Sequence, residues 1–186
     1  GAAFQPFMEW GNDRITLGAW GSATVSPFAF QETDLYLNVY LGRFSLGLVD
    51  YFTYAEQEMV SDFFNWRVQE TGHVLEFLAS YETEGAFPLK LSAGYNLLGA
   101  DELNTLHFTA QLSRNTGPYN TSFELGYTPT RGYYHETKRG ITHAGIQVSK
   151  DLVVSESLSL PFQVGLVFNP MYNQLYMVAV FGIISR

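Results

Sequence analysis

The sequence predicts an all-β fold: an up-and-down antiparallel transmembrane β-barrel of about twelve strands, with ten as the alternative, in one domain over residues 1–186. Three observations lead to this prediction. Segments in which apolar and polar residues alternate with period two recur along the whole chain. Short and long links alternate between these segments. Charged residues make up 15% of the chain and aromatic residues 16%, whereas about 25% of a typical soluble domain is charged.

The clearest unit is a hairpin over residues 33–54. In its first arm, 33–41, leucine and valine alternate with Asp34, Tyr36 and Asn38. Gly42-Arg43 provides a turn of two residues, and the second arm, 44–54, continues the alternation. The rest of the chain repeats this unit.

The other predicted strands show the same alternation. In order, they are Phe4–Trp10, Ile15–Ala23, His73–Tyr81, Phe87–Leu97, Leu106–Ser113, Thr121–Thr128, Ile141–Val154, Leu158–Asn169 and Leu175–Ile184. The alternation is cleanest in 158–169. In 141–154 it loses phase near Lys150-Asp151, which predicts a bulge there.

The lengths of the links favour a membrane barrel. Links after the first, third, fifth, seventh and ninth strands are short, and those after the second, fourth and eighth are long. Short turns at one rim and long loops at the other are typical of bacterial outer-membrane barrels. Such barrels have an even number of strands. Eleven strands therefore predict a twelfth upstream of the first residue, or ten if the count is wrong in 141–154.

Composition narrows the class further. The absence of cysteine excludes disulfides and thiolate metal sites, and a net charge of −8 argues against a nucleic-acid partner. No apolar run approaches the about 20 residues of a membrane helix, whereas strands of about 9–11 residues can form a barrel. The polar faces hold small, uncharged residues, which suits a lumen. A soluble β-barrel or sandwich, apolar inside and charged outside, is the alternative.

Four segments carry a resemblance to a known family: GAWGS, ETDLYLNV, LGLVDYF and LSLPFQVGLVFNP, at Gly18–Ser22, Glu32–Val39, Leu46–Phe52 and Leu158–Pro170. They are similar to small, uncharacterised porin-like outer-membrane β-barrels common in Bacteroidota. The resemblance covers most of the chain and implies a β-barrel fold and a location in the bacterial outer membrane, and it carries over no catalytic residue. We expect no cofactor. Family members usually begin with an extra strand, which agrees with the argument from strand number. Outer-membrane barrels often end on an aromatic residue, and here Phe181 lies five residues before the end.

A polar face that lines a lumen would present a set of carboxylates, amides and bases. These candidates are Glu9, Asp34, Asn38, Glu76, Lys90, His107, Gln111, Glu124, Gln147 and Gln163. A ring of acids selects cations in a pore. Alternatively, the same side chains pair with one another across a filled interior, because barrels of about eight strands are filled by side chains.

Two long links carry aromatic and basic residues. In 55–72, Phe63, Phe64 and Trp66 predict a plug in the mouth, a docking surface or an ordinary surface loop. In 127–140, a second group of residues could meet lipopolysaccharide phosphates or another outer-membrane protein, or could belong to an ordinary surface loop. Its members are Arg131, Tyr133 and Tyr134.

Few residues suggest chemistry. Asp50 shares the face of Leu46 and Leu48, where a carboxylate is costly in a membrane, so a bulge or an interfacial position is expected. A contact with a partner protein or a lipid headgroup is the alternative. His73 belongs to the lipid side of the outer rim, where an enzyme acting on lipids would need a Ser or an acid within hydrogen-bond reach. His135 and His143 are weak evidence for a metal. We therefore expect no enzyme. We expect porin-like passage or binding of small solutes, or alternatively a non-conducting accessory or scaffold subunit of a larger outer-membrane complex.

Overall fold

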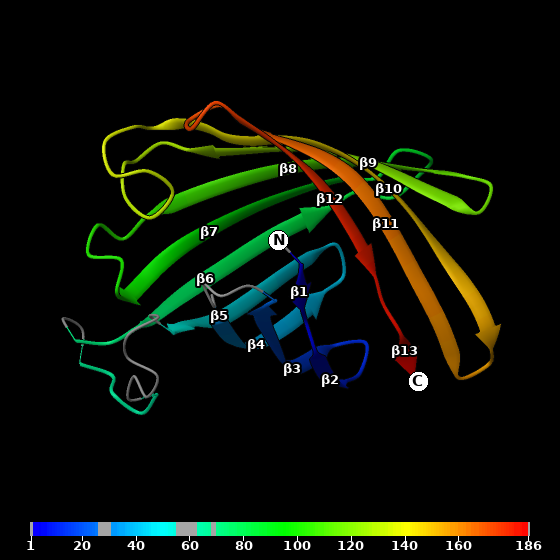
Figure 1. Ribbon diagram of the computed structural model, residues 1–186, viewed down its shortest axis with the longest axis horizontal. Coiled ribbons are helices and arrows are strands. Elements are labelled where there is room, and N and C mark those ends of the chain that lie inside the picture. Colours follow the sequence, from blue (N-terminus) through cyan, green and yellow to red (C-terminus); the bar gives the residue numbers. More distant parts are fainter. Residues whose placement is uncertain (1, 26–30, 55–62, 68–69, 186) are drawn as a thin grey trace. The chain divides into compact units, whose positions relative to one another are not determined.

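The computed structural model describes residues 2–25, 31–54, 63–67 and 70–185. Over these residues the secondary structure is β throughout (Figure 1). The strands are β1 (Ala3–Phe4), β2 (Phe7–Gly11), β3 (Ile15–Thr24), β4 (Gln31–Leu41), β5 (Phe44–Tyr54), β6 (His73–Glu82), β7 (Leu89–Gly99), β8 (Leu106–Thr116), β9 (Tyr119–Thr128), β10 (Gly140–Ser155), β11 (Leu158–Asn169), β12 (Gln174–Phe181) and β13 (Ile184–Ser185). Nowhere in these ranges is there a helix of the length and apolarity needed to cross a bilayer.

The strands follow one another in an up-and-down sheet, as predicted. The hydrogen-bonded order is β1-β3-β4-β5-β6-β7-β8-β9-β10-β11-β12, with β2 beside β3 and β13 beside β11. Because β1 and β2 share one neighbour, and β12 and β13 share another, the described strands occupy the eleven positions that the sequence predicts. The arrangement is consistent with a β-barrel-like fold, although the path has two ends, at β1 and at β12.

The chain divides into two compact units. The first contains Gly1–Tyr81 and Ala93–Leu106, and the second contains Glu82–Ser92 and His107–Arg186. Two-residue turns join β4 to β5 at Gly42-Arg43 and β8 to β9 at Gly117-Pro118. Gly42 and Gly117 both have positive φ, +68° and +58°, which glycine adopts without strain.

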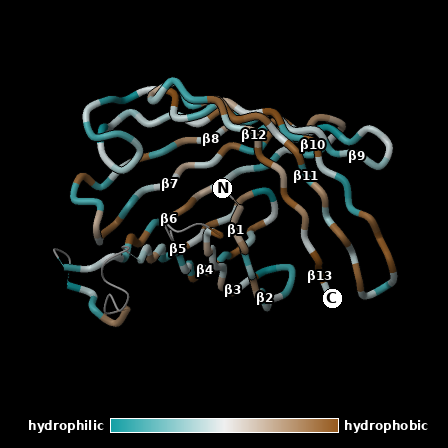
Figure 2. The backbone as a smooth tube through the Cα atoms, in the orientation of Figure 1, coloured by the Kyte–Doolittle hydropathy of each residue, from teal (hydrophilic) through white to brown (hydrophobic). Residues whose placement is uncertain are grey.

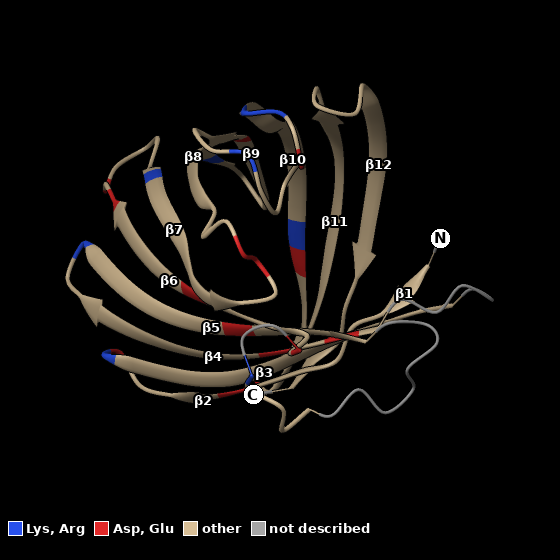
Figure 3. Ribbon diagram, turned by 90° about the vertical axis from the view of Figure 1, so that its left-hand side faces the viewer, with Lys and Arg blue, Asp and Glu red and all other residues tan. Residues whose placement is uncertain are grey.

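The faces of the strands are inverted relative to a soluble protein. Among the described residues, thirteen polar or charged residues are buried, against four large hydrophobic residues. Leucine and phenylalanine side chains are exposed on alternate positions of the strands, for example Leu46, Leu48, Phe123, Leu125 and Leu166. Hydrophobic and hydrophilic residues accordingly alternate along the strands (Figure 2). β11 and β12 carry no charged residue over their whole length (Figure 3).

The bulges lie elsewhere than predicted. β10 pairs in register with β11 through Lys150 and Asp151, so the predicted bulge there is wrong. One register shift occurs between Ile141 and His143 against β9, and another between Val153 and Ser155 against β11. A bulge adds one residue to a strand without changing its partner. The phase of the sequence pattern therefore changes at Thr142 and again near the end of the strand.

Glycines on the polar face make room for large polar side chains of neighbouring strands. A Cβ on Gly18 would lie 2.2 Å from the ring of Tyr36, and one on Gly94 would lie 2.0 Å from the carboxylate of Glu76. The Tyr36 ring and the Glu76 carboxylate thus lie directly against the backbone at these glycines. This explains why glycine recurs within strands that are otherwise regular.

Candidate functional site

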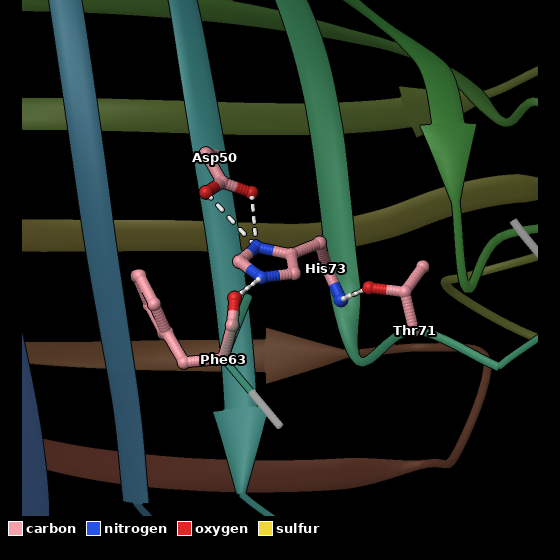
Figure 4. A network of polar contacts seen from close by, with 4 residues as sticks. All are labelled: Asp50, Phe63, Thr71 and His73. Atoms are coloured by element: carbon pink, nitrogen blue, oxygen red, sulfur yellow. Dashed lines mark hydrogen bonds and ion pairs between the residues drawn. The ribbon is translucent and has the colours of Figure 1, made fainter. Parts of the chain in front are cut away.

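Asp50 and His73 form a buried pair in the first unit. Nδ1 of His73 lies 2.8 Å from Oδ1 and 2.9 Å from Oδ2 of Asp50 (Figure 4). The other ring nitrogen, Nε2, lies 2.6 Å from the carbonyl oxygen of Phe63, and Oγ1 of Thr71 accepts from the His73 backbone N–H at 3.1 Å. Because both ring nitrogens face oxygen acceptors, the geometry fits an imidazolium paired with a carboxylate.

Aromatic rings enclose this pair. The Trp66 ring stacks on His73 with centroids 4.0 Å apart and planes 15° apart, a geometry that favours a cationic ring. Phe52 and Phe63 lie 4.5 and 5.0 Å from the same imidazole. His73 and Phe52 are both 0% exposed. We call these residues the His73 cluster: Asp50, Phe52, Phe63, Trp66, Thr71 and His73.

The His73 cluster explains how the carboxylate of Asp50 is accommodated on the apolar face of β5. β5 pairs without a register shift to both β4 and β6, so the predicted bulge at Asp50 is absent and the residue shares the apolar face of Leu46 and Leu48. A carboxylate on an apolar face is stabilised when a paired cation and hydrogen bonds replace water. Residues 63–67 cover the pair, so Asp50 is only 8% exposed.

The described part of the link after β5 therefore packs on the apolar face of β5 and β6. Phe63 and Trp66 contact His73 there, on the face opposite the predicted lumen residues. Phe64 points away and is 83% exposed. Residues 55–62 and 68–69, the remainder of this link before Glu70, lie outside the described residues.

Asp50 is the acid that a catalytic role of His73 would require, but the geometry does not favour catalysis. Nδ1 of His73 is hydrogen-bonded to Asp50. Nε2, the nitrogen that a general base would use, is hydrogen-bonded to the Phe63 carbonyl. The hydroxyl seen beside the histidine, that of Thr71, accepts from its backbone N–H. The cluster is better suited to fastening residues 63–67 to the strands.

Predicted lumen residues of the first unit lie on the polar face, where tyrosines bind the acids. Tyr36 donates to Glu9 at 3.0 Å, and Tyr51 donates to the buried Glu76 at 2.7 Å. Glu9 is exposed, whereas Asp34 and Asn38 are half-buried. Oδ1 of Asp34 is buried and has no hydrogen-bond partner among the described residues. A polar solute or a cation could use that oxygen.

In the second unit, four side chains form a continuous hydrogen-bonded chain. Glu124 Oε1 lies 2.8 Å from His143 Nε2, and His143 Nδ1 lies 3.1 Å from Thr142 Oγ1. The same hydroxyl lies 3.0 Å from His107 Nε2. Tyr134 stacks on His107 with centroids 4.2 Å apart. We call Glu124, His143, Thr142 and His107 the Glu124–His107 chain.

The β10 bulge and a glycine build the Glu124–His107 chain. Thr142 is the extra residue at the bulge, and it is only 3% exposed. A Cβ on Gly126 would lie 2.3 Å from the His143 ring and 2.4 Å from the Thr142 hydroxyl. The bulge places successive polar residues beside β9, and the absent side chain of Gly126 leaves space for them. The sequence pattern identifies Glu124 and His107 but misses Thr142, Gly126 and the role of His143.

The remaining predicted lumen residues lie nearby without joining this chain. Gln111 pairs with Glu124 in register across β8 and β9, and Gln163 pairs with Ser149. Gln111, Gln147 and Gln163 are half-buried, whereas Lys90 is exposed. Glu124 and His143 are close enough to form an ion pair whenever His143 is protonated.

The second aromatic loop folds onto its own unit. Tyr134 stacks on His107 and is half-buried, whereas Arg131 and Tyr133 are exposed. His135 stacks on Tyr172 at 5.0 Å and accepts backbone N–H groups from Thr137 and Lys138. His135 and His143 thus have separate partners. No group of three metal-ligating side chains occurs in the described ranges.

Asp101 organises the link between β7 and β8. Its carboxylate accepts from the Asn96 amide and the Thr105 N–H, both at 2.7 Å, and from the Leu103 N–H at 3.2 Å. Burial by itself raises the pKa of Asp101. The hydrogen bonds from Thr105, Asn96 and Leu103 outweigh burial, so the pKa lies below its ordinary value of 3.8.

We expect this link to lose stability in acid. Because the pKa of Asp101 is lower in the folded state than in the unfolded chain, its contribution is fully present above about pH 4 and disappears as the pH falls through the lowered value. The free energy of unfolding in detergent should be measured against pH for the native chain and for Asp101→Asn. The difference between the two should shrink on acidification. A difference that stays constant down to pH 2 would contradict the assignment.

Comparison of the chain with family models, with curated proteins and with solved structures gives no match.

Proposed function

We propose that the chain is a porin-like outer-membrane β-barrel protein that passes or binds small polar solutes along its polar face. The observation that carries this proposal is the inverted burial of the strands: exposed leucine and phenylalanine on one face and enclosed polar side chains on the other. Water does not favour such a surface, whereas the hydrocarbon of a bilayer does. The resemblance to porin-like proteins of Bacteroidota agrees with this proposal and remains a prediction.

Three features of the strands support membrane insertion. The main strands from β3 to β11 contain ten to sixteen residues, enough for the about 9–11 that cross a bilayer. β11 and β12 are free of charge. On β5, the carboxylate of Asp50 on the apolar face is paired with His73 and covered, as an environment of low dielectric constant requires.

Cations are the solutes that the polar face suits best. Of its predicted charged lumen residues, Glu9, Asp34, Glu76 and Glu124 are acids, against the single base Lys90. Acidic rings favour cation passage. Neither His73 nor the Glu124–His107 chain needs a bound cofactor for this role, and we propose no catalytic activity.

We expect the purified protein to give cation-preferring steps in planar bilayers once heat-modifiable migration shows that it is folded. Glu76→Gln combined with Glu124→Gln should lower the cation-to-anion permeability ratio towards one, because the amides keep hydrogen bonds but remove two of the four acidic charges from the polar face. Glu102→Gln combined with Glu156→Gln, two exposed residues in the β7–β8 link and the β10–β11 turn, provides a control of equal charge change. A folded barrel that never conducts would reject passage as its function.

The exposed side chain of Phe64 favours one alternative, a non-conducting accessory or scaffold subunit. The His73 cluster holds Phe63 and Trp66 on either side of Phe64, so an exposed aromatic ring is presented from a fixed segment. Aromatic side chains often anchor interfaces. Silence in bilayers together with a stoichiometric partner lost on Phe64→Ser would establish this alternative.

A further inference from the structure

We propose that the Glu124–His107 chain is a proton relay. Uptake of a proton at His107 places the resulting positive charge on His143, beside Glu124. The relay draws one residue from β8, one from β9 and two from β10, and every link is between 2.8 and 3.1 Å. These are ordinary hydrogen-bond distances, across which a proton can transfer from donor to acceptor. This inference concerns proton transfer, and only its consequence for solutes rests on the proposed function.

The hydrogen-bond directions follow from one end of the chain. An ionised Glu124 can only accept, so His143 donates through Nε2–H, and the neutral ring leaves Nδ1 bare. The Thr142 hydroxyl must then donate to His143 Nδ1, because it has one hydrogen and that nitrogen has none. Thr142 Oγ1 in turn accepts from His107 Nε2–H. In this arrangement His107 Nδ1 is a bare acceptor, and no hydrogen bond to it is found among the described residues.

One added proton reverses the whole arrangement. A proton binds His107 Nδ1, the Nε2 proton passes to Thr142 Oγ1, and the original hydroxyl proton passes to His143 Nδ1. One N–H bond forms at each histidine, one N–H bond breaks at His107, and the hydroxyl exchanges one proton for another. The products are a neutral His107 with its hydrogen on Nδ1 and an imidazolium at His143, beside the Glu124 carboxylate that stabilises it. No other reactant is required.

The surroundings hold the relay in place. The bulge at Thr142 and the space above Gly126 fix Thr142 and His143, and the stacked Tyr134 ring restrains His107. The charged and titratable groups that face the relay come from every neighbouring segment. They are Glu124 on β9, His107 on β8, His143 on β10, Lys90 on β7 and Tyr134 in the β9–β10 link. Lys90 and both histidines act electrostatically on Glu124.

The relay would give the polar face two chemical states. Before proton uptake, His107 Nδ1 accepts hydrogen bonds and the Glu124 carboxylate faces a neutral His143. Afterwards, His107 Nδ1 donates and the Glu124 charge is paired with an imidazolium. If the polar face conducts solutes, the unprotonated site would favour cations and solutes that donate hydrogen bonds. The protonated site would tolerate anions and solutes that accept hydrogen bonds.

The test is nitrogen NMR of the folded protein in detergent, with ¹⁵N-labelled histidine, across a pH titration. We expect His107 and His143 to be Nε2–H tautomers at high pH. On acidification the pair should take up one proton in a single step, in which His107 becomes the Nδ1–H tautomer while His143 gains its second hydrogen. An Nε2–H tautomer retained by His107 through that step would overturn the relay.

Thr142→Val and Thr142→Ser are the matched variants. Valine keeps the shape but removes the hydroxyl, so the two histidines should titrate separately and His107 should not change tautomer. Serine keeps the hydroxyl and should retain the single step, whereas a valine variant that also retains it would overturn the proposal. The wild-type tautomer change decides the question even if the valine variant does not fold. None of these readouts depends on conductance, so failure of the porin function would leave them interpretable.

Discussion

Replacing Asp50 with alanine is expected to lower the free energy of unfolding by about 3–5 kcal/mol, the usual cost of removing one partner from a buried ion pair. The His73 ring would remain 0% exposed, with Nδ1 facing no acceptor in place of the two carboxylate oxygens. Urea unfolding in detergent, followed by heat-modifiable migration and by tryptophan fluorescence, measures the loss. Trp66 reports on the cluster directly because it stacks on the imidazole.

The double variant Asp50→Leu with His73→Phe is the informative control. It removes both charges and leaves apolar side chains on an apolar face, so it should recover most of the stability lost in Asp50→Ala. Asp13→Ala, in the exposed β2–β3 turn, controls for loss of one acid. If Asp50→Ala unfolds at the same urea concentration as the native chain, the pair does not stabilise the fold. If the double variant is as unstable as the single one, the cluster depends on more than charge pairing.

The strand positions could be predicted because a strand imposes period two on its own sequence, whatever lies beside it. Residues 33–54 and 158–169 show this clearly, and the structure confirms both. The boundary near Phe4 was harder. Pro6 has no N–H, and the first strand is divided there into β1 and β2, although the Pro6 carbonyl still accepts from Gly21.

The sites could not be predicted in the same way because they depend on contacts between distant residues. Asp50 and His73 are 23 positions apart, and only the fold of residues 63–67 over β5 makes the pair a buried one. The alternation correctly marks Asp50 as anomalous but cannot name its partner. Similarly, a bulge adds one residue without a compositional signal. The interaction of Thr142 with both histidines is therefore invisible in the sequence.

Gly99→Ala is expected to be the most disruptive single methyl addition in the first unit. Gly99 has a φ of +114°, a backbone conformation that costs a residue with a Cβ about 1–3 kcal/mol. Its added Cβ would also lie 1.9 Å from the carbonyl oxygen of His73 and 2.7 Å from the carbonyl carbon. These are backbone atoms of β6, so no rotation of a side chain relieves the overlap, and a further loss of about 1–3 kcal/mol follows from overpacking.

Gly85→Ala separates the two contributions. Gly85 has a φ of +121°, close to that of Gly99, but an added Cβ there would meet no atom within 4 Å. We therefore expect Gly85→Ala to show the cost of conformation alone and Gly99→Ala to unfold at a clearly lower urea concentration. The His73 carbonyl also accepts from Ala100 at 2.8 Å, so its displacement should loosen both the His73 cluster and the link that Asp101 organises. Equal losses in the two variants would mean that β6 yields to the added methyl, and that the close approach of Gly99 to His73 does not hold the cluster in place.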